Sequence, residues 1–195
     1  MQSAKELFIH ELTDMLDAEQ KLVEALGQLA SDHSEEPQLQ KGFESHQAQT
    51  EKQVQRIQQI FEQIEEEPED SECKGMKGLI EERDSFKREQ DPANDILAIF
   101  DVGAAIKVES YEISAYNSLI SLAEQLDLSK AVKLLNQSLK EEEQTRTKME
   151  AMSRKLKPDN LGVEEEGEEM GEEESRPARK SAASSRSRAR SRRVA

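Results

Sequence analysis

Apolar side chains recur every three to four residues along most of the chain, with polar residues between them. This spacing is typical of amphipathic helices, whose apolar stripe packs against a core. Helix signals divide the pattern: Ser3 and Glu6 form a capping box, Pro37 suits a first helical turn, and Pro158 ends the pattern. The predicted helices cover residues 3–30, 37–65, 73–88, 92–126 and 128–157.

Four of these helices are long, and short connections join them in two pairs. Such connections make the two helices of each pair antiparallel neighbours. The segment 73–88 is shorter and lies in the long connection between the pairs, after the acidic stretch EEEPEDSE. Before the long helix at 92–126, Asp91 is the expected N-cap and Pro92 the first helical residue. The pattern predicts an all-α antiparallel four-helix bundle of two helical hairpins over residues 1–158, with a short extra helix in the crossover.

Composition is consistent with a helical protein in a reducing compartment. The chain has 195 residues, enough for one domain with a real core. Aromatic residues make up 4% and Trp is absent, which disfavours strands. The single cysteine, Cys73, cannot form an intrachain disulfide, no apolar run approaches a membrane span, and the first residues show no signal-peptide pattern. We therefore expect a soluble, cytoplasmic protein.

Charge distinguishes the body of the chain from its C-terminal tail. Residues 159–195 hold nine acidic and eight basic residues, so the net charge of −15 resides almost wholly in residues 1–158. An acidic body repels nucleic acid. The tail, acidic first and then basic, has no helical stripe and is expected to be disordered. Its Arg/Ser-rich end could bind nucleic acid or an acidic membrane surface, or fold back on the acidic body. The residues expected to make such contacts are Arg186, Arg188, Arg190, Arg192 and Arg193.

Each long helix carries a residue of metal-ligand type in the middle of its apolar stripe. An α-helix turns about 100° per residue, so the face on which a residue lies can be calculated from its number. Glu112 follows one turn after the stripe glutamate of its helix, at the edge of the stripe. The residues within the four stripes are Glu19, His46, Glu109 and Glu142.

These side chains are also expected at one height in the bundle. Ser34 and Asp127 mark the two hairpin turns, from which residues can be counted along each helix. With a rise of about 1.5 Å per residue, the stripe residues, Glu112 and Gln49 fall within roughly one helical turn of the same level. The sequence therefore predicts one polar layer across the centre of the bundle.

A layer of buried carboxylates needs compensation. Ionised carboxylates buried without partners are so costly that they protonate instead, and no Lys or Arg occupies the stripe positions. Two divalent cations would neutralise the layer, and oxygen plus imidazole ligation suits iron or manganese, with zinc also open. The alternative is a metal-free layer whose glutamates reach water, since Glu and Gln are common in this chain. Tyr116 is either a hydrogen-bond partner of a ligand or of bound oxygen, or simply a core tyrosine.

Five segments within roughly residues 3–156 carry a family resemblance. They are ELTDMLDAEQKL, FESHQAQTEKQVQRI, CKGMKGLIEE, KVESYEISAYNSLISLAEQL and KLLNQSLKEEEQT. These segments resemble the YciE/YciF-like branch of the ferritin-like superfamily, and KVESYEISAYNSLISLAEQL is the most specific of them. The resemblance implies a ferritin-like four-helix bundle, a homodimer, a dinuclear metal site and an association with bacterial stress responses.

The resemblance also implies a ligand set, with departures from the usual pattern. Ferritins and rubrerythrins carry Glu-x-x-His on the second and last helices of the bundle. This chain has His46-x-x-Gln49 and Glu142-x-x-Thr145 there, so a weaker, degenerate or single-ion site is an open alternative. Gln49, Tyr116 and Thr145 are additional or supporting candidates. The ligands implied are Glu19, His46, Glu109, Glu112 and Glu142.

The expected function is that of a ferritin-like metal-binding protein in the oxidative or general stress response. It would act through peroxide or dioxygen chemistry, as a di-metal oxidoreductase, or through metal sequestration. The alternative is a metal-free structural or interaction protein of the stress response, associated with nucleic acid through its tail.

Overall fold

The computed structural model describes residues 1–159, which contain five α-helices and no strand. The all-α fold, the two hairpins and the extra helix of the crossover are confirmed. No helix of residues 1–159 is long and apolar enough to cross a membrane. The predicted tail and its arginines lie outside the described residues. The helices are α1 (Ala4–Asp32), α2 (Pro37–Ile64), α3 (Lys74–Gln90), α4 (Asn94–Gln125) and α5 (Ser129–Ser153).

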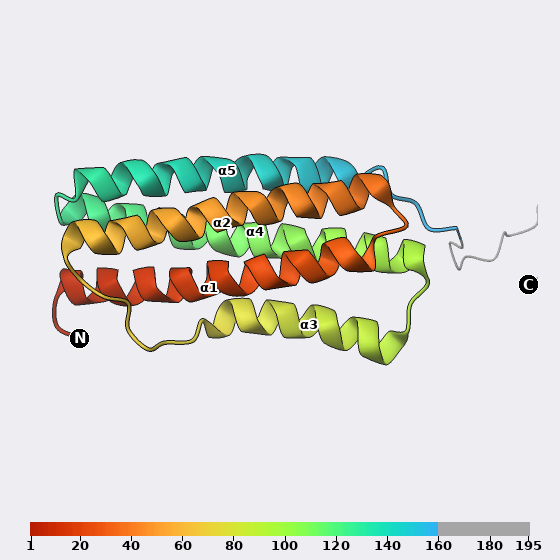
Figure 1. Cartoon of the computed structure of the whole chain (residues 1–195), viewed down its shortest axis with the longest axis horizontal. Helices are drawn as coiled ribbons and strands as arrows, with labels where there is room; N and C mark the ends of the chain where they lie inside the picture. The colour runs from red at the N-terminus through yellow and green to blue at the C-terminus, as the bar shows by residue number, and fades with distance from the viewer. Residues whose placement is uncertain (160–195) are drawn as a thin grey trace, which may run out of the picture. The chain divides into compact units, whose positions relative to one another are not determined.

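Helices α1, α2, α4 and α5 form the bundle, and α3 lies along one side of it (Figure 1). Each hairpin packs its two helices against each other, and the hairpins meet where α1 contacts α4 and α2 contacts α5. Neighbouring helices of the four-helix bundle run in opposite directions (Figure 1). Helix α3 packs against α1 and α4, so it covers the seam between the two hairpins on that side.

The helix ends follow their local signals in most places. Ser3 accepts a hydrogen bond from the backbone N–H of Glu6, while the Glu6 carboxylate reaches back to the backbone N–H of Gln2. Cys73 caps α3 by accepting from the backbone N–H of Met76, which gives this buried cysteine a structural role.

One predicted cap is wrong. Asp91 does not cap α4 but ends α3, in the left-handed conformation with φ of 42°. A residue in that conformation cannot also supply the extended backbone of an N-cap. Pro92 and Ala93 therefore form the connection, and α4 begins at Asn94 with Ala93 as its N-cap.

The apolar core divides into two clusters along the bundle. One cluster includes Phe8, Leu12 and Phe61, and the other includes Leu26 and Phe43. In α2, α4 and α5, the residues of the two clusters are separated in the sequence by the predicted polar residues, and in α1 the boundary between the clusters falls just before Glu19. The polar side chains thus occupy the middle of the bundle, with apolar core above and below.

Candidate metal centre

All five predicted ligands are buried in the middle of the bundle. The four glutamates are 0% exposed and the histidine is 4% exposed, and together they come from all four bundle helices. Apolar residues about one helical turn before and after each of these side chains pack into the core, so helical periodicity places the polar side chain on the inner face as well. We call this group the carboxylate layer; it consists of Glu19, His46, Glu109, Glu112 and Glu142.

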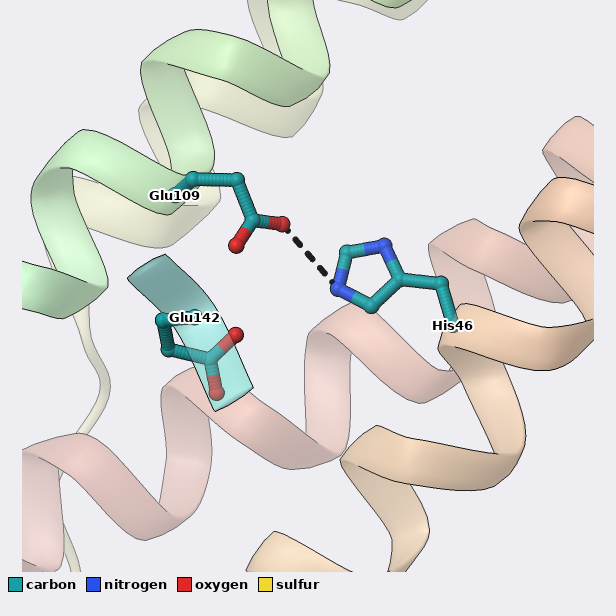
Figure 2. Close-up of side chains that lie close together, drawn as sticks. All are labelled: His46, Glu109 and Glu142. Atoms are coloured by element: carbon teal, nitrogen blue, oxygen red, sulfur yellow. Dashed lines mark ion pairs between the residues drawn. The ribbon is translucent and has the colours of Figure 1, made fainter. Parts of the chain in front are cut away.

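Three members of the layer converge on one point (Figure 2). One ligand atom from each of His46, Glu109 and Glu142 lies within 4.8 Å of the other two. Two ligands of one zinc-sized ion lie at most about 4.4 Å apart, twice a typical bond length, so small side-chain movements would bring the triad onto one ion. The arrangement can therefore hold a metal ion.

The contact between His46 and Glu109 has the distance of a hydrogen bond but not its geometry. Nε2 of His46 lies 3.0 Å from Oε1 of Glu109, yet neither atom has an aligned hydrogen-bond partner. Two ligands of a common ion can lie this close to each other, because both bind the same ion. Both atoms are therefore available to an ion between them.

Glu19 and Glu112 complete the layer beside the triad. The Tyr116 hydroxyl donates a hydrogen bond to Oε1 of Glu19 and is itself fully buried. Oε2 of Glu19 and both carboxylate oxygens of Glu112 have no hydrogen-bond partner. Tyr116 therefore supports a candidate ligand and leaves that ligand's second oxygen available.

The unpartnered atoms are the strongest feature of the layer. Buried polar side chains in folded proteins nearly always have partners, because an unpaired polar group costs about 1–3 kcal/mol. Within residues 1–159, every buried side-chain nitrogen or oxygen without a hydrogen-bond partner belongs to the carboxylate layer or to Gln53, which contacts it. The missing hydrogen bonds are therefore confined to this one place in the bundle.

Burial makes these carboxyl groups reluctant to ionise. Burial, followed by the charge of Glu109, raises the pKa of Glu142 to about 10. Burial likewise raises the pKa of Glu109 to about 8. The pKa values of Glu19 and Glu112 are also well above the usual range, first through burial and then through the charge of a neighbouring carboxylate. Without a cation, the layer keeps protons at neutral pH.

The imidazole is shifted in the opposite direction. Burial, assisted by the positive charge of Lys148, lowers the pKa of His46 to about 4. His46 is therefore neutral at physiological pH and has a lone pair for a metal. It cannot serve as the cation that neutralises the glutamates.

Gln53 supports the layer from α2 and was not predicted. It is fully buried, and its amide donates to Oε1 of Glu142 and, at 3.3 Å, to Glu141. Arg56 pairs with both carboxylate oxygens of Glu141 at 2.7 and 2.8 Å, so its charge is used there. Gln53 lies seven residues after His46, two helical turns along the same face, and this spacing could have identified it.

The additional candidates Gln49 and Thr145 lie at the edge of the layer. Thr145 is 5% exposed and accepts a hydrogen bond of 3.1 Å from the amide of Gln49, which is half-buried. The two side chains are thus hydrogen-bonded to each other, and neither adds an unpartnered buried atom to the layer.

A second buried charged group lies near the end of α1 and was also not predicted. Asp101 is 0% exposed and accepts hydrogen bonds of 2.8 Å from Nε and Nη2 of Arg83, and Nε2 of His33 lies 2.8 Å from its Oδ2. Nη2 of Arg83 also donates to Asp32 at 2.7 Å. We call these four residues the Asp101 cluster. The cluster joins α1, α3 and α4.

The chain is similar to characterised and solved proteins over most of its length. Residues 3–161 match the family described as a domain of unknown function, DUF892. Protein YciF of Escherichia coli (strain K12) is 39% identical over 150 residues, which cover 76% of this chain and 89% of that protein.

Solved structures show the same arrangement of helices. The crystal structure of the E. coli stress protein YciF matches with a TM-score of 0.73 and 36% identity, over 80% of this chain and 98% of that one. YcfI from Rhodopseudomonas palustris, provisionally described as a structural protein, matches with a TM-score of 0.72 and 33% identity, over 76% and 94% of the two chains. The chain therefore belongs to the DUF892 family, with a YciF-like, ferritin-like bundle.

Proposed function

We propose that this chain is a ferritin-like metal-binding protein that holds iron or manganese in the carboxylate layer and acts in the oxidative or general stress response. The observation that carries the proposal is the cluster of buried, unpartnered ligand atoms in residues 1–159. The likeness to YciF, which is described as a stress protein, supports the physiological context.

The donor set fits two divalent ions in charge and in kind. Four ionised carboxylates carry the negative charge that two such ions balance, and one neutral imidazole adds a nitrogen ligand. Iron and manganese accept this mixture of oxygen and nitrogen ligands, and zinc does so as well. The triad of His46, Glu109 and Glu142 would hold one ion, and Glu19 and Glu112 would hold the second together with shared carboxylates.

Two redox-active metal ions bound there would supply one-electron steps toward peroxide or dioxygen, and the protein would then be a di-metal oxidoreductase; without such steps it would sequester metal. The chain's own residues orient the ligands. Tyr116 holds Glu19 and Gln53 holds Glu142, each through a single hydrogen bond to one carboxylate oxygen. The apolar clusters on both sides exclude bulk water, which strengthens each charge interaction in the layer.

Metal reconstitution tests the proposal directly. We expect purified protein incubated anaerobically with Fe(II) or Mn(II) to retain up to two ions per chain by elemental analysis. Its melting temperature should rise, because a ligand at 100 times its Kd stabilises the native state by about 2.7 kcal/mol. The Glu109→Gln/Glu142→Gln variant should lose both effects.

The matched control is Glu143→Gln, which changes an exposed carboxylate next to Glu142. It should bind metal as the unmodified protein does. Retention of less than about one ion per ten chains by the unmodified protein would contradict the proposal, since an intact site in this ligand set is expected to bind first-row ions at micromolar metal.

The second candidate is a metal-free structural or interaction protein, favoured by the provisional description of YcfI. In that case the glutamates would remain protonated, as their raised pKa values allow. The double Gln variant separates the two functions. At pH 8 it should stabilise a metal-free protein whether or not metal is added, whereas in a metalloprotein it should remove a metal-dependent gain.

The proposal has four further parts. The chain divides into a bundle at 1–158 and a tail at 159–195, it forms a homodimer, it is located in the cytoplasm, and its Arg/Ser-rich tail binds nucleic acid. The basic residues of the tail offer contacts to phosphates, which salt weakens. Light scattering tests the dimer. DNA binding that persists after deletion of residues 175–195 would contradict the role of the tail.

A further inference from the structure

An apolar pocket of about 80 Å³ lies between α1, α3 and α4 and reaches the carboxylate layer. Its walls are mainly aliphatic side chains, among them Leu22, Leu79 and Val108. On the inner side it is lined by His46, a candidate ligand. Helix α3, which the crossover lays along the seam between the hairpins, supplies one wall of the pocket (Figure 1).

The polar groups around the pocket other than His46 are engaged with one another. Arg83 is engaged by Asp101 and Asp32, and the Gln28 amide donates to Asp32 at 2.8 Å. A buried water needs two to four polar partners, and the aliphatic walls of this pocket offer none. The pocket is therefore suited neither to an anion nor to a chain of ordered waters.

His46 is the exception among these polar groups. It is 4% exposed, and neither ring nitrogen has an aligned hydrogen-bond partner. The pocket thus connects an apolar space with an unsatisfied ligand of the candidate centre. A molecule in this space would lie beside the centre without competing for hydrogen bonds.

We propose that this pocket is a binding site for a small apolar molecule, which it delivers to the His46 side of the centre. The volume is about half that of an engineered apolar cavity of about 150 Å³ that stays dry and binds benzene or xenon. Diatomic gases and xenon fit such a space, and polar oxidants such as peroxide do not gain from it. The inference rests on the proposed function, where it favours dioxygen over peroxide as the reactant.

Xenon is the probe for the site itself, because it is apolar and needs no metal. Crystals of the full chain under xenon pressure should show xenon between α1, α3 and α4. Ala105→Leu, which replaces a 6%-exposed methyl group on the pocket wall by an isobutyl group, should remove it. Ala25→Leu does the same from α1, at a half-buried position, in case the first variant folds poorly.

Kinetics test the connection to the centre. In protein loaded with Fe(II), oxidation by dioxygen should be several-fold slower in the pocket variants, while metal content and the rate with hydrogen peroxide stay unchanged. The control Ala48→Leu makes the same replacement at an exposed position of α2 and should change neither rate.

Absence of xenon from the unmodified pocket would overturn the proposal, and so would an unchanged dioxygen rate in a variant that excludes xenon. Equal slowing with both oxidants would also overturn it, because the variants would then act on the centre itself. Loss of metal binding in the unmodified protein is a different failure: it would remove the proposed function, while xenon occupancy still decides whether the pocket takes an apolar molecule.

Discussion

The bundle buries charged side chains in two places, and it treats them differently. In the Asp101 cluster, the carboxylate accepts from Arg83 and from His33, and Arg83 is shared with Asp32. None of these side chains has a buried atom without a partner. In the carboxylate layer, four glutamates share one neutral imidazole, and most of their oxygens have no partner. Asp101 is as buried as the four glutamates, but only Asp101 has a buried cationic partner.

The pKa values record the same contrast. Burial by itself would raise the pKa of Asp101, but the hydrogen bonds from Arg83 and His33 outweigh burial and lower it. No comparable partner acts on Glu142, whose pKa rises to about 10. A buried carboxylate is therefore ordinary where the fold supplies its cation. Where the fold does not supply a cation, the unpaired carboxylates indicate a functional site, because burying such groups without a partner costs stability.

The largest effect should come from breaking the compensated cluster. Asp101→Asn removes the charge that Arg83 and His33 share, and loss of one partner of a buried ion pair costs about 3–5 kcal/mol. We expect the free energy of unfolding, measured with urea, to fall by this amount with or without metal. The control Asp84→Asn removes an exposed carboxylate that contacts Arg83 at 3.4 Å and should have little effect. If Asp101→Asn were as stable as the unmodified protein, the partners of Asp101 would not stabilise the fold, and the two regions would not differ as described.

The contrast also explains what the sequence could predict. The carboxylate layer comes from four long helices whose faces and heights follow from residue number alone, so its five candidate ligands could be placed before the fold was known. The same arithmetic would have reached Gln53, two turns after His46. The four-helix bundle followed from the same periodicity and from the short hairpin turns.

The Asp101 cluster could not be placed in this way. Arg83 comes from α3, whose orientation depends on packing against α1 and α4 and not on a hairpin turn. His33 lies just past the end of α1, where helical phase no longer applies. Asp91 shows the same limit at short range, because its left-handed backbone ends one helix where the local sequence indicated the start of the next.

The second prediction concerns the uncompensated layer. At pH 8 without metal, Glu109→Gln/Glu142→Gln should raise the free energy of unfolding by about 1–4 kcal/mol. The native state of the unmodified protein must keep protons on carboxyl groups that are ionised in the unfolded chain, and neutral amides of similar size do not carry this cost. Urea titrations after exhaustive chelation would measure the gain. Glu143→Gln, at an exposed site, should produce no gain. A double variant less stable than the unmodified metal-free protein would show that the layer is compensated after all.

The third prediction is a dependence on pH of opposite sign for the carboxylate layer and for Asp101. The folded-state pKa values of Glu109 and Glu142, about 8 and about 10, lie above the ordinary value of 4.5, so the native state keeps protons that the unfolded chain has lost. Metal-free stability should therefore fall as pH rises from about 4.5 through 8. Asp101 has a lowered pKa, so its contribution is present above its ordinary value of 3.8 and is lost only as pH falls below it.

The Glu109→Gln/Glu142→Gln variant shows how much of the pH dependence of stability comes from the carboxylate layer. Urea midpoints measured between pH 5 and pH 9 after chelation should decline in the unmodified protein and decline much less in Glu109→Gln/Glu142→Gln, since the variant retains only the remaining glutamates of the layer. His33 adds a shared decline in both proteins, because its hydrogen bonds to Asp101 and Glu36 outweigh burial and raise its pKa, so that its stabilising proton is lost as pH rises. Parallel curves for the two proteins would mean that the decline comes from His33 and not from the carboxylate layer. Saturating Fe(II) or Mn(II) should cancel the excess decline of the unmodified protein, because a cation takes the place of the protons.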